Sequence, residues 1–129
     1  MSSRSGPGWK KYPDHHITLK PAGVHVQVKC NGEVIADTSR AIQMEEAAGG
    51  HTVAPVVYYI PRSDVKMDRL VRSSHQTYCP FKGQASYYSI VNGPENAVWT
   101  YEEPYDEMLA IKERLAFYPD KVDSIAIVG

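Results

Sequence analysis

Residues 77–83, TYCPFKG, place one of the two cysteines of the chain directly before a proline and three residues before a lysine. Because proline is pre-organised for the second position of a β-turn, this segment predicts a turn with Cys79 and Lys82 at its ends. The Cα atoms of two such residues lie within about 7 Å, so the Lys82 ammonium could stabilise a Cys79 thiolate. His75, four residues before the cysteine, is a candidate base. These three residues are the candidate catalytic set of an enzyme with a cysteine nucleophile, of the acyl-transfer or nucleotidyl-transfer kind.

A structural role explains the same turn without any catalysis. Cysteine is among the most buried residue types, so Cys79 can be a small apolar side chain beneath the turn. Lys82 would then lie in solvent or donate a hydrogen bond to a carbonyl oxygen. We favour the structural role, because a Cys–Lys pair lacks the base and orienting group that nucleophilic catalysis usually shows. The chain also lacks the Cys-x-x-Cys motif of redox proteins.

Charged and aromatic side chains recur at the ends of several predicted strands. Arg62 follows the run 56–60 after one proline, and its guanidinium could bind a carboxylate or phosphate bidentately. If these strand ends meet, apolar walls with a few convergent polar groups would form a small-molecule site near residues 75–88. The candidate lining residues are Arg62, Tyr78, Lys82, Tyr87, Trp99 and Glu102. The competing explanation is that the tyrosines form cross-strand pairs that only stabilise the sheet.

No metal or cofactor site is predicted. Asp64 and Asp68 are four residues apart and could hold Mg²⁺, but charges at the start of a helix explain them better. The five histidines are scattered without the spacing of metal ligands. We therefore expect a small organic or anionic ligand, with no cofactor and no metal.

Composition narrows the class of protein. A chain of 129 residues has room for one hydrophobic core, and a formal net charge of −1 argues against a nucleic-acid binder. No apolar run approaches the roughly 20 residues of a membrane span, and the first 16 residues hold no signal-peptide core. We therefore expect a cytoplasmic protein with free thiols. Nine tyrosines suit half-buried sheet faces, pocket walls or a homodimer interface, so the chain is expected to be a monomer or a homodimer.

The elements that must position these residues are mainly strands. Apolar and polar residues alternate over 24–30, and the Asn31-Gly32 pair that follows is typical of a hairpin. A return strand over 34–38 would place Cys30 in the core, opposite Val34. Further strands are predicted at 41–45, 56–60, 85–91, 97–101, 115–118 and 122–128, with short helices at 63–70 and from Pro104 onward.

These elements predict one mainly β domain. The fold expected for residues 17–129 is a single compact antiparallel β-sandwich or open barrel with two short helices, because the strands and helices do not alternate as in βαβ units. Residues 1–16 are rich in Ser, Gly, Pro and basic residues and are expected to form a flexible N-terminal arm.

Five segments, in this order, resemble the family catalogued as domain of unknown function 427. They are NGEVIADTSRAI (31–42), VVYYIPRSDVKMD (56–68), HQTYCPFKGQASYYSI (75–90), ENAVWTYEEPYDE (95–107) and AFYPDKVD (116–123). The resemblance implies a small, mainly β bacterial domain without an established activity, and some labels of the family suggest nucleotidyl transfer. The chain has neither of the glycine-rich phosphate-binding motifs that would support that label. It also carries Arg114 close to a position where similar sequences often carry histidine.

Overall fold

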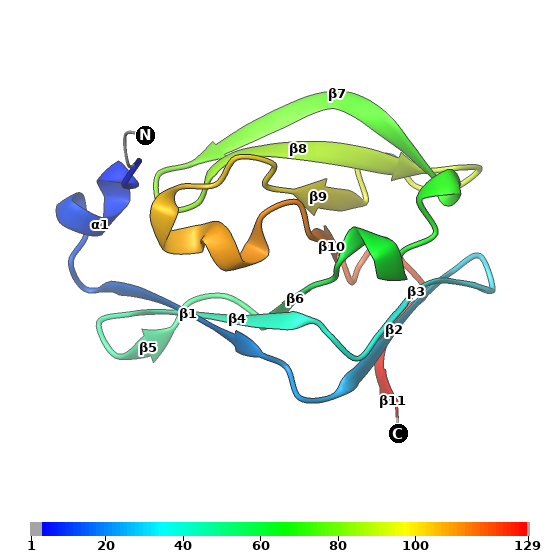
Figure 1. Ribbon diagram of the computed structural model, residues 1–129, viewed down its shortest axis with the longest axis horizontal. Coiled ribbons are helices and arrows are strands. Elements are labelled where there is room, and N and C mark those ends of the chain that lie inside the picture. The colour runs from blue at the N-terminus through cyan, green and yellow to red at the C-terminus, as the bar shows by residue number, and fades with distance from the viewer. Residues whose placement is uncertain (1–3, 129) are drawn as a thin grey trace.

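Three antiparallel sheets make up most of the chain in the computed structural model, which describes residues 4–128 (Figure 1). The first sheet contains β1 (His15–Pro21), β4 (Ile42–Ala48), β5 (His51–Thr52) and β6 (Val57–Tyr59). The second contains β7 (Leu70–Cys79), β8 (Gly83–Ile90), β9 (Val98–Thr100) and β10 (Leu115–Phe117). The third contains β2 (His25–Cys30), β3 (Glu33–Thr38) and β11 (Ser124–Val128). The mainly β, antiparallel fold is confirmed, and none of these sheets closes into a barrel.

The hairpin predicted at Asn31 and Gly32 is present between β2 and β3. Both loop residues have positive φ, 53° and 76°, which a two-residue loop of this kind requires. Cys30 is buried as predicted, but it pairs with Glu33 rather than Val34, because the loop is one residue shorter than expected. A bulge then restores the expected register at the far end of the hairpin, in the pairs Val28–Ala36 and Val26–Thr38.

The two short helices predicted from the sequence are 3₁₀ turns. The first is split into η1 (Arg62–Asp64) and η2 (Met67–Arg69), because Val65 between them is extended and bridges Ala36 of β3. The second is η3 (Asp106–Ile111), which is kinked at Met108. Burial of Met108 holds this kinked segment against the tyrosine-rich part of the core.

The stretch 1–16, expected to be a loose arm, contains regular structure within its described part, residues 4–16. A short helix, α1 (Pro7–Lys11), packs on the turn between β7 and β8, and β1 begins at His15. The Gly8 amide donates to the Pro80 carbonyl at 3.0 Å, and the Trp9 indole donates to the Phe81 carbonyl at 3.1 Å. A Cβ at Gly8 would lie 2.8 Å from the Phe81 ring, so glycine permits this close approach. The boundary expected after residue 16 is therefore not a structural boundary.

The second sheet carries apolar side chains on both faces. One part of the core joins Val98 and Phe117 to the strands of the third sheet. The other part is rich in tyrosine and joins Tyr59, Tyr87 and Tyr101. Burial raises the pKa of Tyr59 and of Tyr101 far above the ordinary phenol value, so both stay neutral hydrogen-bonding groups. These three rings are enclosed within the chain, where they cannot form an intermolecular face.

None of the helices between residues 4 and 128 combines the length and apolarity of a membrane span.

Candidate functional site: a polar cleft beside the β7–β8 hairpin

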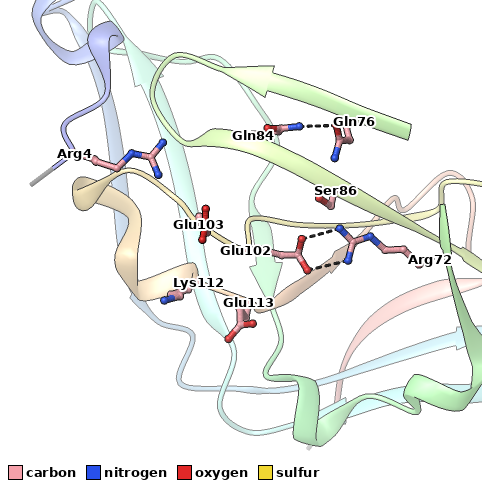
Figure 2. A pocket seen from close by; sticks show the side chains of 9 residues that line it. All are labelled: Arg4, Arg72, Gln76, Gln84, Ser86, Glu102, Glu103, Lys112 and Glu113. Carbon is pink, nitrogen blue, oxygen red and sulfur yellow. Dashed lines mark hydrogen bonds and ion pairs between the residues drawn. The ribbon is translucent and has the colours of Figure 1, made fainter. Parts of the chain in front are cut away.

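A cleft of about 490 Å³ opens between the β7–β8 hairpin and the segment that leads from β9 into η3 (Figure 2). Almost all of its lining is polar or charged, although the same sheet also carries apolar side chains on both faces. The lining residues are Arg4, Arg72, Gln76, Gln84, Ser86, Glu102, Glu103, Lys112 and Glu113.

The floor of the cleft follows from strand alternation. Gln84 and Ser86 lie two residues apart on β8, so both point to the same face of the sheet. Ser86 pairs with Gln76 on one side and with Thr100 on the other, which extends this polar face across three strands. The Gln84 amide donates to the Gln76 amide oxygen at 2.6 Å (Figure 2). Ser86 is a mostly buried residue that lies at the floor of the cleft.

A paired arginine and glutamate form one wall of the cleft. The Arg72 guanidinium donates two hydrogen bonds to the Glu102 carboxylate, at 3.0 and 2.8 Å (Figure 2). These bonds to Glu102 raise the pKa of Arg72, so the guanidinium stays charged. Behind the wall, Arg62 lies 3.9 Å from the same carboxylate and donates to the Tyr88 hydroxyl at 3.0 Å and to the Glu113 carbonyl at 2.7 Å. Glu102 is thus neutralised by two cations that the fold holds in place.

The rim carries charges of both signs that the protein does not neutralise. Arg4 lies over the Tyr105 ring, with its guanidinium carbon 5.5 Å from the ring centre. Within the described chain, neither Arg4, Lys112 nor Glu103 takes part in an ion pair. A bound molecule would therefore meet charges at the rim that no protein group already occupies.

Of the residues predicted to line a pocket, Glu102 lines this cleft, and Arg62 lies behind it. Tyr78 lies on the same face of the sheet, because it pairs with Gln84. Its ring is exposed and its hydroxyl lies 2.7 Å from the hydroxyl of Tyr105, so it stands beside the cleft without lining it.

Tyr87 and Trp99 point to the opposite face. They pair with each other across β8 and β9. This pair is one residue along from the Ser86–Thr100 pair, so its side chains point to the other face. Tyr87 is buried, with its hydroxyl 2.9 Å from the Thr77 hydroxyl. The Trp99 indole donates to the Tyr59 hydroxyl at 3.2 Å. The two rings expected as walls of the predicted pocket therefore lie behind the sheet on which the polar cleft is built.

Lys82 lies at a separate place. Its ammonium binds the carboxylate of Glu46 on β4, and the His15 ring lies 3.0 Å from the same carboxylate. The His15 ring in turn stacks on Phe81, with ring centres 4.1 Å apart. Lys82 and Arg62 share no partner among the described residues, so the two cations predicted for one pocket belong to two different sites.

The three candidate catalytic residues are not joined by hydrogen bonds. Cys79 is half-buried and ends β7, and Gly83 opposite it has a φ of 110° that completes the predicted turn. The His75 ring packs at a tilt against the Tyr87 ring, with ring centres 4.5 Å apart. His75 lies four residues before Cys79, about 13 Å along a strand. In the described structure the Cys79 thiol makes no hydrogen bond to His75 or to Lys82. This geometry does not supply the base and orienting group of an activated thiol.

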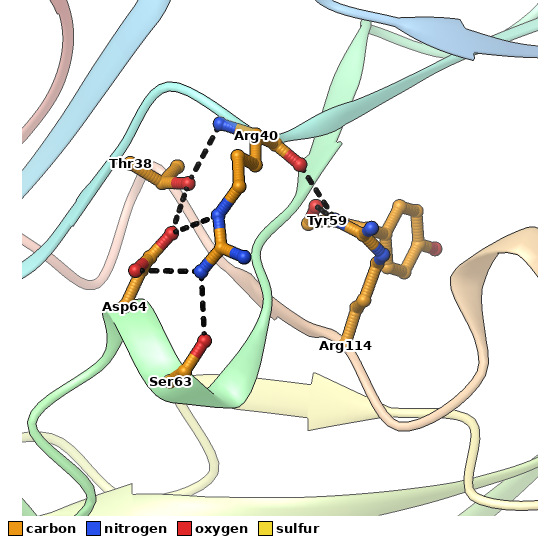
Figure 3. Close-up of polar contacts among 6 residues, drawn as sticks. All are labelled: Thr38, Arg40, Tyr59, Ser63, Asp64 and Arg114. Carbon is orange, nitrogen blue, oxygen red and sulfur yellow. Dashed lines mark hydrogen bonds and ion pairs between the residues drawn. The ribbon is translucent and has the colours of Figure 1, made fainter.

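Another charged cluster ties η1 to the rest of the fold (Figure 3). Asp64 accepts hydrogen bonds from Arg40, at 3.0 and 3.3 Å, and from the Thr38 hydroxyl at 2.7 Å. Hydrogen bonds from Arg40 and then Thr38 lower the pKa of Asp64. Arg114 donates to the Arg40 carbonyl at 2.7 Å and to the Tyr59 carbonyl at 3.4 Å. The aspartate that could have held Mg²⁺ is thus occupied by protein groups.

Most residues that line the cleft were missed at the level of sequence. The main reason is β7, a strand of ten residues whose sequence LVRSSHQTYC has no regular alternation of apolar residues. Because this strand was not predicted, there was no basis in the sequence for placing Arg72 and Gln76 beside β8. The one usable signal was β8 itself, where Gln84 and Ser86 alternate with Ala85 and Tyr87.

Comparison with known proteins agrees with the resemblance seen in the sequence. The family model described as "Domain of unknown function (DUF427)" matches residues 18–127, nearly the whole chain. No curated protein matches the sequence significantly.

Proposed function

Because the chain belongs to the DUF427 family, whose description states no activity, we propose a function from its geometry: it binds a small polar organic molecule that carries an anionic group. The binding site is the cleft beside the β7–β8 hairpin, and the chain acts as a binding module. A volume of about 490 Å³ is in the range of pockets that hold metabolite-sized ligands.

The observation that carries the proposal is the convergence of polar and charged side chains on one cavity. The Ser86 side chain lies at the floor, so its hydroxyl is available to bond a ligand or water in the cleft. The paired amides of Gln76 and Gln84 leave one donor group and one acceptor group free toward the cleft. These groups suit the hydroxyl, amide or carbonyl groups of an organic ligand.

The balance of charge favours an anionic group on that ligand. Including Arg62 behind the wall, four cations and three carboxylates surround the cleft, whereas the chain as a whole has a net charge of −1. Glu102 is neutralised by its two arginines and does not repel an anion. Arg4 and Lys112 are the cations free to attract a carboxylate or phosphate. In this proposal they take the part that the sequence had suggested for Lys82.

A thermal-shift and calorimetric screen tests the proposal. The panel contains small carboxylates, amino acids and phosphate monoesters, together with uncharged analogues of the same size. A ligand at 100 times its dissociation constant should raise the free energy of unfolding by about 2.7 kcal/mol. Loss of a hydrogen bond to a charged group costs about 1.5 kcal/mol or more, so Lys112→Ala should weaken binding about tenfold.

Matched controls separate the cleft from the rest of the surface. Gln84→Ala should also weaken binding, whereas Gln27→Ala and Lys29→Ala, on β2 and away from the cleft, should leave it unchanged. If the uncharged analogues bind as well as the anions, or if Lys112→Ala and Gln84→Ala behave like their controls, the proposed site is wrong.

A further inference from the structure

A second cavity, of about 390 Å³, lies at the β10 edge of the second sheet, where all three sheets approach one another. Its lining is almost entirely apolar, in contrast to the polar cleft. The lining residues are Val28, Ala54, Pro55, Val56, Val57, Tyr58, Ile60, Trp99, Phe117, Tyr118, Pro119 and Ile125.

We propose that this cavity is a binding site for a small, uncharged aromatic molecule, with room for one or two rings and at most one hydrogen-bonding substituent. This site is separate from the polar cleft, and no residue lines both. Apolar cavities as small as about 150 Å³ stay dry and bind benzene, so a cavity of this size and lining can hold a substituted ring.

The choice of an aromatic ligand rests on the side chains that face the cavity. The rings of Tyr58, Trp99 and Tyr118 are only partly buried, although each packs against the core. The centres of the Trp99 and Tyr118 rings lie 4.4 Å apart, and the two ring planes are tilted by 41°. The two rings are therefore not parallel to each other. A flat ring can stack on one and meet the edge of the other, the two arrangements that aromatic pairs prefer.

The choice of an uncharged ligand rests on the absence of charged side chains from the lining. Tyr118 and Tyr58 supply the only side-chain oxygen atoms of the cavity wall. Burial and the neighbouring hydroxyl of Tyr87 raise the pKa of Tyr118, which therefore stays a neutral phenol. A carboxylate or ammonium in this cavity would lose its hydration without gaining an opposite charge. A phenol or an alcohol can instead exchange one hydrogen bond with a tyrosine hydroxyl.

Residues 54–56 form an outer part of the cavity wall, through which a ligand could enter. Val53 and Val56 are exposed apolar residues, and the segment follows the loop of Gly49 and Gly50. Ala54 lies between the two valines and contributes only a methyl group to the cavity. A larger side chain at position 54 should therefore occupy the entrance without changing a core residue.

The test uses tryptophan fluorescence, because Trp9 and Trp99 are the only tryptophans in the chain. In the variant Trp9→Phe, excitation at the red edge of the tryptophan band reports on Trp99 alone. We expect p-cresol and benzyl alcohol to change the Trp99 emission saturably, and benzoate to bind at least tenfold more weakly than benzyl alcohol. Ala54→Phe should weaken binding of p-cresol at least tenfold, whereas Ala110→Phe, on the exposed surface of η3, should leave it unchanged.

A second measurement does not depend on the folding of any variant. Nuclear Overhauser contacts should join the ring protons of p-cresol to the methyl groups of Ile60 and Ile125 in the unmodified protein. Absence of saturable binding up to the solubility limit of p-cresol, benzoate binding as tight as that of benzyl alcohol, or contacts to methyl groups elsewhere would each overturn the assignment. Lys112→Ala, which tests the polar cleft, should leave p-cresol binding unchanged, so the two proposals fail independently.

Discussion

The Lys82–Glu46 ion pair tests whether a mostly buried pair of charges stabilises this fold. The two side chains are only 12% and 16% exposed, and they join the turn after β7 to β4 of the first sheet. Removing one partner of a buried pair leaves an unpaired charge and costs about 3–5 kcal/mol. Here His15 also contacts Glu46 and some exposure remains, so Lys82→Met should lower the free energy of unfolding by about 2–3 kcal/mol.

The matched control is an exposed ion pair between β1 and β4. Glu45, the neighbour of Glu46, pairs with Lys20 at 3.7 Å, and both side chains are about half exposed. Lys20→Met should therefore change the free energy of unfolding by less than about 1 kcal/mol. The double variant Lys82→Met with Glu46→Leu should recover part of the loss, because it removes the unpaired carboxylate.

Urea unfolding at pH 7, followed by circular dichroism, measures all four proteins, and the midpoint shift at constant slope gives the change in stability. If Lys82→Met is as mild as Lys20→Met, the Lys82 ammonium does not stabilise the fold, and the reasoning that assigns it to structure is refuted. Lys82 would then again be free to serve a ligand or the Cys79 thiol, as the sequence had suggested.

Two further predictions concern Asp64 and the cysteines. Hydrogen bonds from Arg40 and Thr38 lower the pKa of Asp64 in the folded state, so its contribution to stability is present above the ordinary carboxyl pKa of about 3.9 and is lost as pH falls through the lower folded value. The Asp64→Asn variant should therefore be less stable than the unmodified protein at pH 7, and its stability should fall less steeply below pH 4. Urea titrations at several pH values measure this. If stability depends on pH in the same way in both proteins, the prediction is contradicted. Burial raises the pKa of Cys30, which is 4% exposed, whereas Cys79 is half-buried. Ellman's reagent at pH 8 should modify Cys79 first and Cys30 only upon unfolding, and equal rates would show that Cys30 is not enclosed.

The polar cleft and the apolar cavity are two hollows of one domain with chemically different linings. The cleft combines charged groups with free amides, and the cavity has ring walls and no charge. Trp99 lines the cavity, although the sequence had suggested it as part of a mixed aromatic and basic pocket. The aromatic and the basic components expected near residues 75–88 therefore exist, but the sheet separates them.

Local patterns in the sequence were sufficient for the elements with strong alternation or turn signals. The hairpin at Asn31-Gly32, the burial of Cys30 and the turn at residues 80–82 depend on residues close together in the chain, and the structure contains all three. The two short helices were also expected, although Val65 divides the first because it bridges to β3.

Elements without a local signal were not predictable. β7 is polar along most of its length and becomes a strand because β8 supplies its hydrogen-bond partners. The helix α1 exists where Trp9 and Gly8 meet the turn after β7, more than 70 residues later. Neither the pairing of β7 with β8 nor the contact of α1 with this turn produces a regular apolar pattern in the nearby sequence.

The sequence by itself determined the fold class, the family and the kinds of side chain available for a site. Only the tertiary structure decided which of them meet, because that depends on strand register. Successive residues of a strand point to opposite faces, so a single step along β8 separates Tyr87, behind the sheet, from Ser86 and Tyr88 on the side of the cleft. Outside the strands, the turn after β7 brings Lys82 to Glu46, whereas η1 places Arg62 beside Glu102.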